Sequence, residues 1–302
     1  MAIDTGSEPS DSSPTNPAFE YLFGSHLSVA GGPVNAVLAA KRLALKSLSI
    51  FLASPRVWHR TLPDADLAVL FRRQAQSAGL VSVIMHALYL ANPASPRQDL
   101  LAQTIDAVTT ELTACHILGI PWLVLHPGAC RGSGIASGIR RVAQTLDACF
   151  ESVGSCSAGI ALETTAGTGT TLGGRFDHLR DIIGTSRYSD RLSICLDTCH
   201  IFVAGYDLRT SEAWAITREQ IERTVGLHRI RVIHLNDTPE QLGSQRDRHT
   251  HIGQGHIGRE GFRHILLDPI CRTVPMILET PKDNTGSLDR MNIAELKAIT
   301  LL

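Results

Sequence analysis

The sequence lacks the features that mark secreted, membrane-spanning or strongly basic proteins. Its seven cysteines are odd in number and include no C-x-x-C pair, which argues against a disulfide framework and a zinc ribbon. A reduced intracellular compartment fits better: the cytoplasm of a prokaryote, or the nucleus or mitochondrion of a eukaryote. No apolar run approaches the ~20 residues that a membrane-spanning helix needs. The net charge is −1, so any basic surface that attracts nucleic acid must be local.

The first residues differ in composition from the rest of the chain. Residues 1–18 are rich in Ser, Pro and Asp and have little to bury, so we expect a disordered tail. They contain no basic stretch followed by an apolar core, which argues against a signal peptide. The remaining residues, 19–302, are apolar enough to bury one large core, and we expect them to form one domain.

One pattern recurs eight times: a short apolar, β-branched run ends in a polar residue and is followed by a loop and an amphipathic segment. Near-continuous apolar runs are typical of parallel strands that are buried on both faces. The pattern predicts an α/β fold, a single (β/α)₈ TIM barrel, with a doubly wound open sheet as the alternative. The runs end at His26, Ser54, His86, His126, Glu163, Asp197, His234 and Glu279. The predicted helices are 35–46, 64–78, 97–118, 139–153, 177–183, 211–225, 261–268 and 288–300.

All but one of these strand ends carry a histidine or a carboxylate. Active sites of TIM barrels lie at the C-terminal ends of the strands, so a closed barrel would bring these side chains to one mouth. Several carboxylates that face one another in a cleft would repel unless cations lay between them. Imidazole with carboxylate suits zinc or a similar first-row ion, and the number of ligands implies a cluster.

Two loops add further candidate ligands. His200 follows Asp197 by three residues, and Asp247 and His249 have a D-x-H spacing that lets one extended segment bind an ion. The stretch "SICLDTCH" also contains Cys195 and Cys199. We favour the Asp/His pair over these thiols, with Cys195 as an apolar filler one layer deeper in the barrel. A reactive thiol at Cys199 stays open as an alternative.

Eight motifs, in fixed order from about Phe23 to Pro281, resemble the endonuclease IV family of zinc-dependent apurinic/apyrimidinic (AP) endonucleases. They are "GSHLSVAGG", "HPG", "ALETTAGTG", "CLDTCHIFVAGYD", "HLND", "DRH", "IGQGHIG" and "ILETP". The resemblance implies three zinc ions per chain. The implied ligands are His86, His126 and Glu163 at the first ion, the bridging Glu163 with Asp197, His234 and Glu279 at the second, and His200, Asp247 and His249 at the third. His26 matches a family histidine that supports the site without binding metal.

The resemblance also implies the reaction. Members hydrolyse the phosphodiester bond 5′ to an abasic site in duplex DNA, leaving a 3′-hydroxyl and a 5′-deoxyribose phosphate. A water shared by two zinc ions would be acidified to hydroxide. Glu279 would orient or deprotonate it, and Glu163 would bridge the ions. We expect the partner to be double-stranded DNA that contains abasic sites, no membrane, and a monomer.

Loops around the predicted mouth are expected to contact the DNA. Arg56, Trp58 and Tyr89 match positions where family members press into the minor groove, with loop packing as the alternative for both aromatic residues. Several loop positions depart from the family pattern and remove a donor or a charge, which predicts weaker binding of duplex DNA. These departures are Ala53, Val57, Thr168, Pro239 and Gln245.

Two other functions compete with the nuclease. A metal-dependent sugar isomerase or epimerase on a related barrel would use one or two ions and would have no use for His200, Asp247 and His249. A non-catalytic binder of damaged DNA would have no need for Glu279. Metal content per chain separates the first alternative from the nuclease, and nicking of an abasic duplex separates the second.

Overall fold

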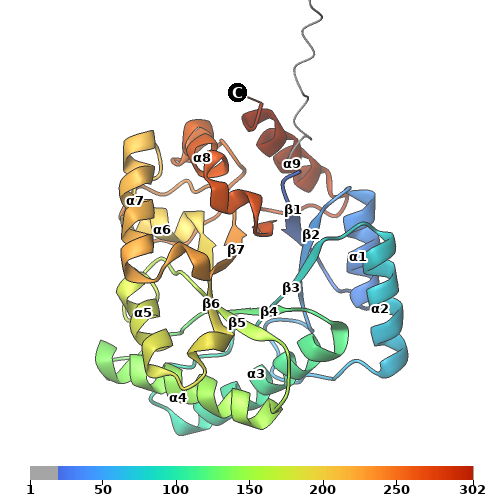
Figure 1. The fold of residues 1–302 in the computed structure, drawn as a ribbon, viewed down its shortest axis with the longest axis vertical. Helices are drawn as coiled ribbons and strands as arrows, with labels where there is room; N and C mark the ends of the chain where they lie inside the picture. The colour runs from blue at the N-terminus through green and yellow to red at the C-terminus, as the bar shows by residue number, and fades with distance from the viewer. Residues whose placement is uncertain (1–19, 302) are drawn as a thin grey trace, which may run out of the picture.

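The computed structural model describes residues 20–301, so the expected tail, residues 1–18, lies outside the described part of the chain. Eight parallel strands form a closed barrel in sequence order, and the last strand pairs with the first (Figure 1). This confirms the predicted (β/α)₈ fold. The strands are β1 Phe23–His26, β2 Ser47–Phe51, β3 Ser82–His86, β4 Trp122–Leu125, β5 Gly159–Glu163, β6 Leu192–Asp197, β7 Ile230–His234 and β8 Met276–Leu278.

Helices surround the barrel, and the short α6 lies inside their ring beside β6 and β7 (Figure 1). The α-helices are α1 Pro33–Arg42, α2 Ala65–Ser77, α3 Gln98–Leu118, α4 Ile135–Val153, α5 Phe176–Thr185, α6 Thr198–Ala204, α7 Ser211–Thr224, α8 Gly258–Leu267 and α9 Ser287–Ile299. Three 3₁₀ turns, η1 Ser189–Arg191, η2 Leu227–Arg229 and η3 Pro269–Arg272, precede β6, β7 and β8. Within residues 20–301, none of the helices has the length and apolar character needed to cross a bilayer.

Apolar side chains fill the barrel interior and the layer between strands and helices. One inner cluster takes one side chain from each of the six consecutive strands β3 to β8 and is completely buried. Cys195 belongs to this cluster and fills space among its apolar side chains. The members of the inner cluster are Ile84, Val124, Ala161, Cys195, Val232 and Ile277.

Most predicted boundaries shift by one to four residues, and three differences from the sequence-based expectation have a clear local cause. Strand β2 ends at Phe51 rather than Ser54, because Phe51 pairs with His86 and β3 ends there. Helix α1 ends at Arg42 rather than Lys46, because Ala44 adopts a left-handed conformation (φ 50°). The chain after Asp197 forms the helix α6 rather than a simple turn, with the Asp197 carboxylate accepting a hydrogen bond from the His200 N–H at 2.9 Å.

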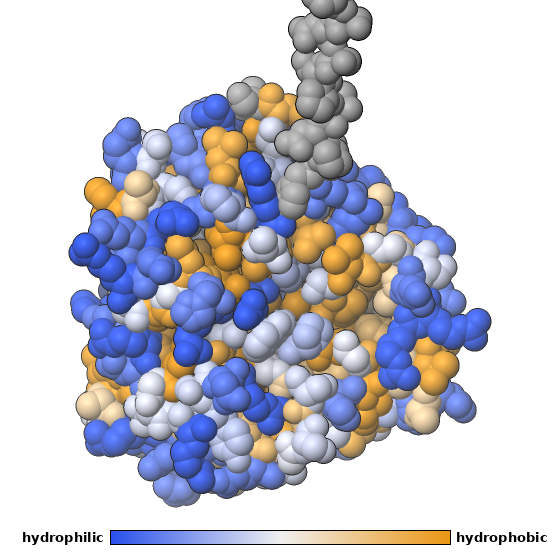
Figure 2. Space-filling model, viewed as in Figure 1, coloured by the Kyte–Doolittle hydropathy of each residue, from blue (hydrophilic) through white to orange (hydrophobic). Residues whose placement is uncertain are grey.

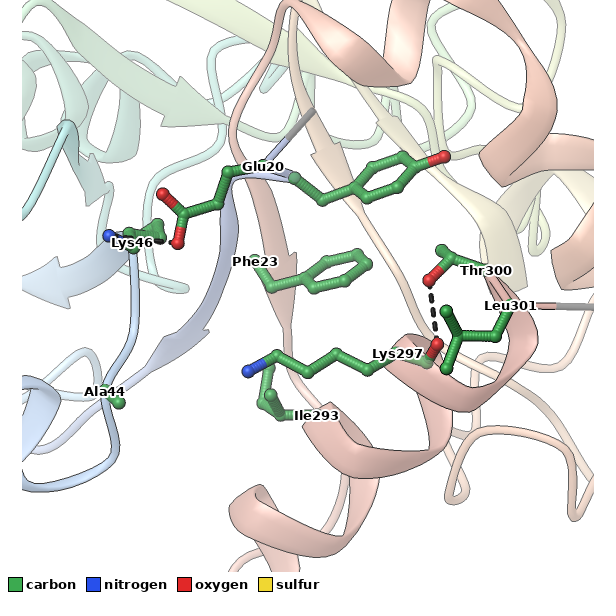
Figure 3. A pocket seen from close by; sticks show the side chains of 9 residues that line it. Glu20, Phe23, Ala44, Lys46, Ile293, Lys297, Thr300 and Leu301 are labelled. Atoms are coloured by element: carbon green, nitrogen blue, oxygen red, sulfur yellow. Dashed lines mark hydrogen bonds and ion pairs between the residues drawn. The ribbon is translucent and has the colours of Figure 1, made fainter. Parts of the chain in front are cut away.

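Hydrophilic and hydrophobic residues alternate over the face seen in Figure 2, and no single apolar patch covers it. A pocket of about 430 Å³ lies at the opposite end of the barrel from the strand-end residues, between the start of β1 and the end of α9 (Figure 3). Tyr21 and Phe23 stack there with ring centres 5.2 Å apart, and Lys46 pairs with Glu20 at 3.0 Å. Glu20 is the one carboxylate among the described lining residues, which include no histidine or cysteine. The pocket therefore lacks the cluster of histidines and carboxylates that lies at the C-terminal ends of the strands.

Candidate metal centre

Glu163, the last residue of β5, lies at the centre of the barrel mouth and is completely buried. Its Oε2 atom is 3.1 Å from His86 Nε2 and 2.8 Å from His126 Nε2. Its Oε1 atom is 2.9 Å from His234 Nδ1. The two carboxylate oxygens thus face two different sets of histidines. His86, His126 and Glu163 form what we name the first group, whose ligand atoms all lie within 4.8 Å of one another.

The second group consists of Glu163, Asp197, His234 and Glu279, within the same 4.8 Å limit. His234 Nδ1 is 3.2 Å from Glu279 Oε2 and 3.8 Å from Asp197 Oδ2. Asn236 lies between the two carboxylates: its Nδ2 donates to Asp197 Oδ2 at 2.7 Å, and its Oδ1 accepts from the Glu279 N–H at 2.8 Å. One amide side chain therefore fixes two of the candidate ligands.

The third group consists of His200, Asp247 and His249 and comes from helix α6 and the loop after β7. Asp247 lies between the rings, with Oδ2 3.1 Å from His200 Nε2 and Oδ1 3.3 Å from His249 Nε2. Each Nδ1 contacts a backbone carbonyl, that of Thr164 at 2.8 Å for His200 and that of Glu279 at 3.2 Å for His249. Both Nε2 atoms are buried and face Asp247 at ion-pair distance, but neither makes a hydrogen bond of regular geometry within residues 20–301. Rings held at Nδ1 with Nε2 turned towards a shared carboxylate are typical of metal-ligating histidines.

In these groups, carboxylates lie close to imidazole rings that can carry the opposite charge. Burial alone would raise the pKa of Glu163, but His126 and His234 outweigh it and hold this pKa well below its usual range. Burial alone would lower the pKa of His200, but Asp197 and Asp247 outweigh it and raise the pKa to about 10. Imidazole and carboxylate groups this close together can share a divalent cation, so the residues present fit a metal.

His26, at the end of β1, supports the centre from the side. Its Nδ1 is 3.1 Å from Glu279 Oε1 and 3.4 Å from the hydroxyl of Ser49. Burial, partly offset by Glu279, lowers the pKa of His26. His26 thus contacts a candidate ligand without joining any of the three groups, and its supporting role stays a prediction.

Both thiols of the "SICLDTCH" stretch lie closer to the candidate ligands than we expect from the sequence. The Cys195 sulfur is within 4.8 Å of ligand atoms of Glu163 and His234, and Cys199 is similarly close to Asp197 and His249. Burial raises the pKa of Cys195 to about 12, so this thiol is protonated. Cys199 is completely buried and donates to a backbone carbonyl at 3.5 Å. The raised pKa of Cys195 and the hydrogen bond of Cys199 disfavour these thiols as ligands, although both lie within reach of an ion, and the Asp/His pair stays the preferred interpretation.

The three residues expected to contact DNA have different exposures. Arg56 is exposed. Tyr89 is 56% exposed, and its ring centre is 5.7 Å from that of His86, which puts it beside the first group. Trp58 is half-buried and packs against the hydrophobic core. Val57, one of the departures from the family pattern, is 50% exposed.

A buried ion pair that the sequence analysis missed holds the loops carrying these residues. Arg60 Nε donates to Glu111 Oε1 at 2.8 Å, and both side chains are almost completely buried. The other oxygen of Glu111 accepts from the Leu88 N–H at 3.4 Å. The Tyr89 N–H donates to the Pro55 carbonyl at 3.0 Å. Helix α3 thus joins the loop after β2 to the loop after β3.

Other supporting residues were also missed. Thr164 accepts from the Asp197 N–H through its hydroxyl at 2.9 Å, in addition to its contact with His200. Asn236 holds Asp197 and Glu279, as described above. Thr164 lies one residue after the end of β5, in the motif "ALETT", and Asn236 lies two residues after the end of β7, in "HLND". Polar residues one or two positions beyond each strand end are the signal that could have identified them.

The protein is a closed TIM barrel. Three adjoining groups of histidines and carboxylates form the mouth of this barrel. The family model described as "Xylose isomerase-like TIM barrel" matches residues 37–299. The probable endonuclease 4 of Chloroflexus aurantiacus is 44% identical over 278 residues, which cover 92% of this chain and 97% of that protein. The chain therefore belongs to the endonuclease IV family of xylose isomerase-like TIM barrels.

Solved structures agree with this assignment. The crystal structure of endonuclease IV from Thermus thermophilus is 33% identical, with a TM-score of 0.82 over 92% of this chain and 98% of that one. A D-tagatose 3-epimerase-like protein is 17% identical, with a TM-score of 0.69 over 92% of this chain and 98% of that one. At this low identity the second similarity concerns the fold alone.

Proposed function

We propose that this protein is a zinc-dependent AP endonuclease that acts in DNA repair. It would cleave the phosphodiester bond 5′ to an abasic site in duplex DNA and leave a 3′-hydroxyl and a 5′-deoxyribose phosphate. The names of its relatives support a nuclease of this family. The observation that carries the proposal is the set of three ligand groups at one barrel mouth, two of which share Glu163.

Each group would hold one zinc ion, because histidine nitrogens and carboxylate oxygens are ligands that zinc accepts. Glu163 would bridge the ions of the first and second groups, since its two oxygens face different histidines. When bound, the ions would lower the pKa of a water molecule and neutralise charge on the phosphate.

Glu279 is the best-placed general base of the mouth. Burial would raise its pKa, but His234 and His26 outweigh this and hold the pKa well below its usual range. The carboxylate is therefore ionised near neutral pH and can accept a proton from a water that attacks the phosphorus. His26 contacts the carboxylate, and the Asn236 side-chain oxygen accepts from the Glu279 backbone N–H, so side chain and backbone of Glu279 are both held. Its side chain is 14% exposed, so substrate can approach it.

Exposed loop residues beside the first group would bind the DNA. Arg56 can contact phosphate, and Tyr89 offers a ring face at the edge of the mouth. An abasic nucleotide is poorly stacked, so turning it out of the duplex towards the mouth costs less than for an intact nucleotide. Recognition of the lesion would follow from this difference in cost.

Cleavage of a synthetic duplex with one abasic site tests the proposal. We expect nicking on the 5′ side, loss of nicking with a strong chelator, and recovery with zinc. Glu279→Gln should slow nicking by about 10²- to 10⁴-fold, because the amide cannot accept the proton. A nick 3′ to the lesion, or full activity in the chelated protein, would overturn it.

The third group argues against a sugar isomerase or epimerase. Such an enzyme needs one or two ions, whereas His200, Asp247 and His249 form a separate group beside the other two. Metal analysis of the purified protein separates the two functions. A content near three zinc ions per chain supports the nuclease, and one ion per chain with activity on ketoses would contradict it.

A further inference from the structure

Asp237, three residues after the end of β7, is a completely buried carboxylate outside the three candidate groups. Oδ1 accepts from the N–H groups of Thr238 and Ile257 at 2.8 and 3.1 Å. Oδ2 accepts from those of Gly255 and Gly258 at 2.9 and 3.3 Å. Four backbone donors thus converge on one side chain. A buried carboxylate is costly unless such donors surround it, so this arrangement requires a structural or functional reason.

The bonds of Asp237 close the loop that carries two members of the third group. Its backbone carbonyl accepts from the Thr250 N–H at 2.8 Å, directly after His249. Its side chain binds the end of the same loop, where helix α8 begins at Gly258. One residue therefore fixes the loop at two points on the C-terminal side of Asp247 and His249.

The other side of the loop is held by α6. The N–H groups of Gly243 and Gln245 donate to carbonyls of Phe202 and Val203 at 3.2 and 2.9 Å. Between these two anchors the Asp247 side chain is 49% exposed. Core packing therefore contributes little to holding it, and its position depends on the two anchors.

We infer that Asp237 is a positioning residue for the third metal site, an inference that rests on the proposed metal centre. Asp237 holds the C-terminal half of the loop between β7 and α8, so that Asp247 and His249 face His200 before a metal binds. Without this carboxylate the loop samples other conformations, and the third group loses affinity for zinc. The first and second groups keep theirs, because their ligands come from strands and strand ends.

The replacement Asp237→Asn tests the inference with little change in shape. An asparagine presents an NH₂ group where one carboxylate oxygen accepted two N–H donors, so donor faces donor. Removal of such support around a metal ligand typically lowers metal affinity by about 10- to 100-fold. We therefore expect wild type to bind three zinc ions. The variant should bind two with unchanged affinity and the third about 10- to 100-fold more weakly, measured with zinc against a chromogenic chelator.

Asp147 on α4 offers a matched control. It is a buried carboxylate that also fixes a loop, accepting from the Ser186 hydroxyl at 2.5 Å and the Arg187 N–H at 3.1 Å. That loop precedes β6 and lies at the opposite end of the barrel from the metal centre. Asp147→Asn should lower the melting temperature without changing zinc stoichiometry. Asp247→Asn, which removes a ligand directly, sets the reference for loss of the third ion.

A second variant disturbs the contact between the Asp237 carboxylate and the loop by changing the loop backbone instead of the carboxylate. A Cβ added at Gly255 would overlap the Thr238 carbonyl and the Asp237 carboxylate. Gly255→Ala should therefore weaken the third ion selectively, and it decides the question if Asp237→Asn fails to fold. Circular dichroism verifies the fold of each variant.

Three zinc ions at wild-type affinity in Asp237→Asn, or equal weakening of all three, would overturn the role of Asp237. So would selective loss of one ion in Asp147→Asn. A wild-type protein that binds fewer than three ions contradicts the proposed metal centre itself. The two failures are therefore distinguishable in one set of titrations.

Discussion

The candidate metal centre and the loops proposed to contact DNA adjoin each other at the barrel mouth but are built in different ways. The candidate ligands are mostly buried, and hydrogen bonds with Thr164 and Asn236 hold several of them. Arg56 and Tyr89 are exposed, and the loops that carry them depend on the buried pair of Arg60 and Glu111. Many short hydrogen bonds thus fix the candidate metal ligands, whereas few fix the loops of the proposed recognition surface.

The largest effect should follow from replacing Glu163, which the first and second groups share. Glu163→Gln removes a charge that two ions would use, so nicking of an abasic duplex should fall by at least about 10³-fold. Binding of the duplex should fall much less, because the loops remain intact. Gel-based nicking assays and fluorescence anisotropy measure the two effects. Glu151→Gln, at an exposed site, should change neither. Equal losses of nicking and binding would remove the distinction between the two regions.

Replacing Arg60 should affect the loops and not the metals. Arg60→Leu leaves Glu111 buried without its partner, which at a pH high enough to ionise Glu111 typically costs about 3 to 5 kcal/mol of unfolding free energy. We expect weaker binding of abasic duplex with unchanged zinc content. Denaturant unfolding and metal analysis provide the measurements. The double variant Arg60→Leu with Glu111→Leu should regain much of the stability, because no unpaired charge remains. Loss of zinc in the single variant would show that the two regions are coupled.

The same ion pair predicts a pH dependence of stability. Burial, partly offset by Arg60, raises the pKa of Glu111 from 4.5 to about 7. The resulting contribution to stability is fully present below pH 4.5 and is lost as the pH rises through about 7. Relative to Glu111→Gln, the wild-type unfolding free energy should therefore fall by up to about 3 kcal/mol over this range. Urea unfolding of both proteins at several pH values measures this. If the wild-type unfolding free energy rose relative to that of Glu111→Gln as the pH increased, the raised pKa of Glu111 would be contradicted.

The smallest effect should distinguish the two aromatic residues of the loops. Tyr89→Ala should weaken binding of abasic duplex by about 1 to 3 kcal/mol, because an exposed ring is available for stacking. Trp58→Ala should mainly lower the melting temperature, since Trp58 packs against the core. Anisotropy titrations and thermal unfolding of both variants test this contrast. A larger binding defect in Trp58→Ala would favour the sequence-based expectation that Trp58 enters the minor groove.

The regular part of this molecule could be predicted from the sequence. His86, Glu163 and Asp197 end their strands as the apolar runs indicate, and His126 and Glu279 follow theirs by one residue. Barrel closure then brings these side chains together, because the C-terminal ends of all parallel strands meet at one mouth. The ligand positions follow from a repeated local pattern and from one global constraint.

The irregular part could not be predicted in the same way. The ion pair of Arg60 and Glu111 joins residues 51 positions apart, and neither belongs to a strand-end pattern. The exposures of Trp58 and Tyr89 depend on how this pair folds the loops. Asp237 appears in the quoted motif "HLND", but its four backbone donors come from separate parts of the following loop. Contacts of this kind depend on tertiary structure and leave no periodic signal.

Water reaches the candidate ligands mainly at His126 and Asp247, whose side chains are 34% and 49% exposed. His249 and Glu279 are 17% and 14% exposed, and the other candidate ligands are almost completely buried, so an ion would enter and leave mainly through these openings. A duplex bound across the mouth would cover both openings. Substrate would then protect the enzyme from metal loss during each catalytic cycle, and depletion by a chelator would proceed through the DNA-free protein.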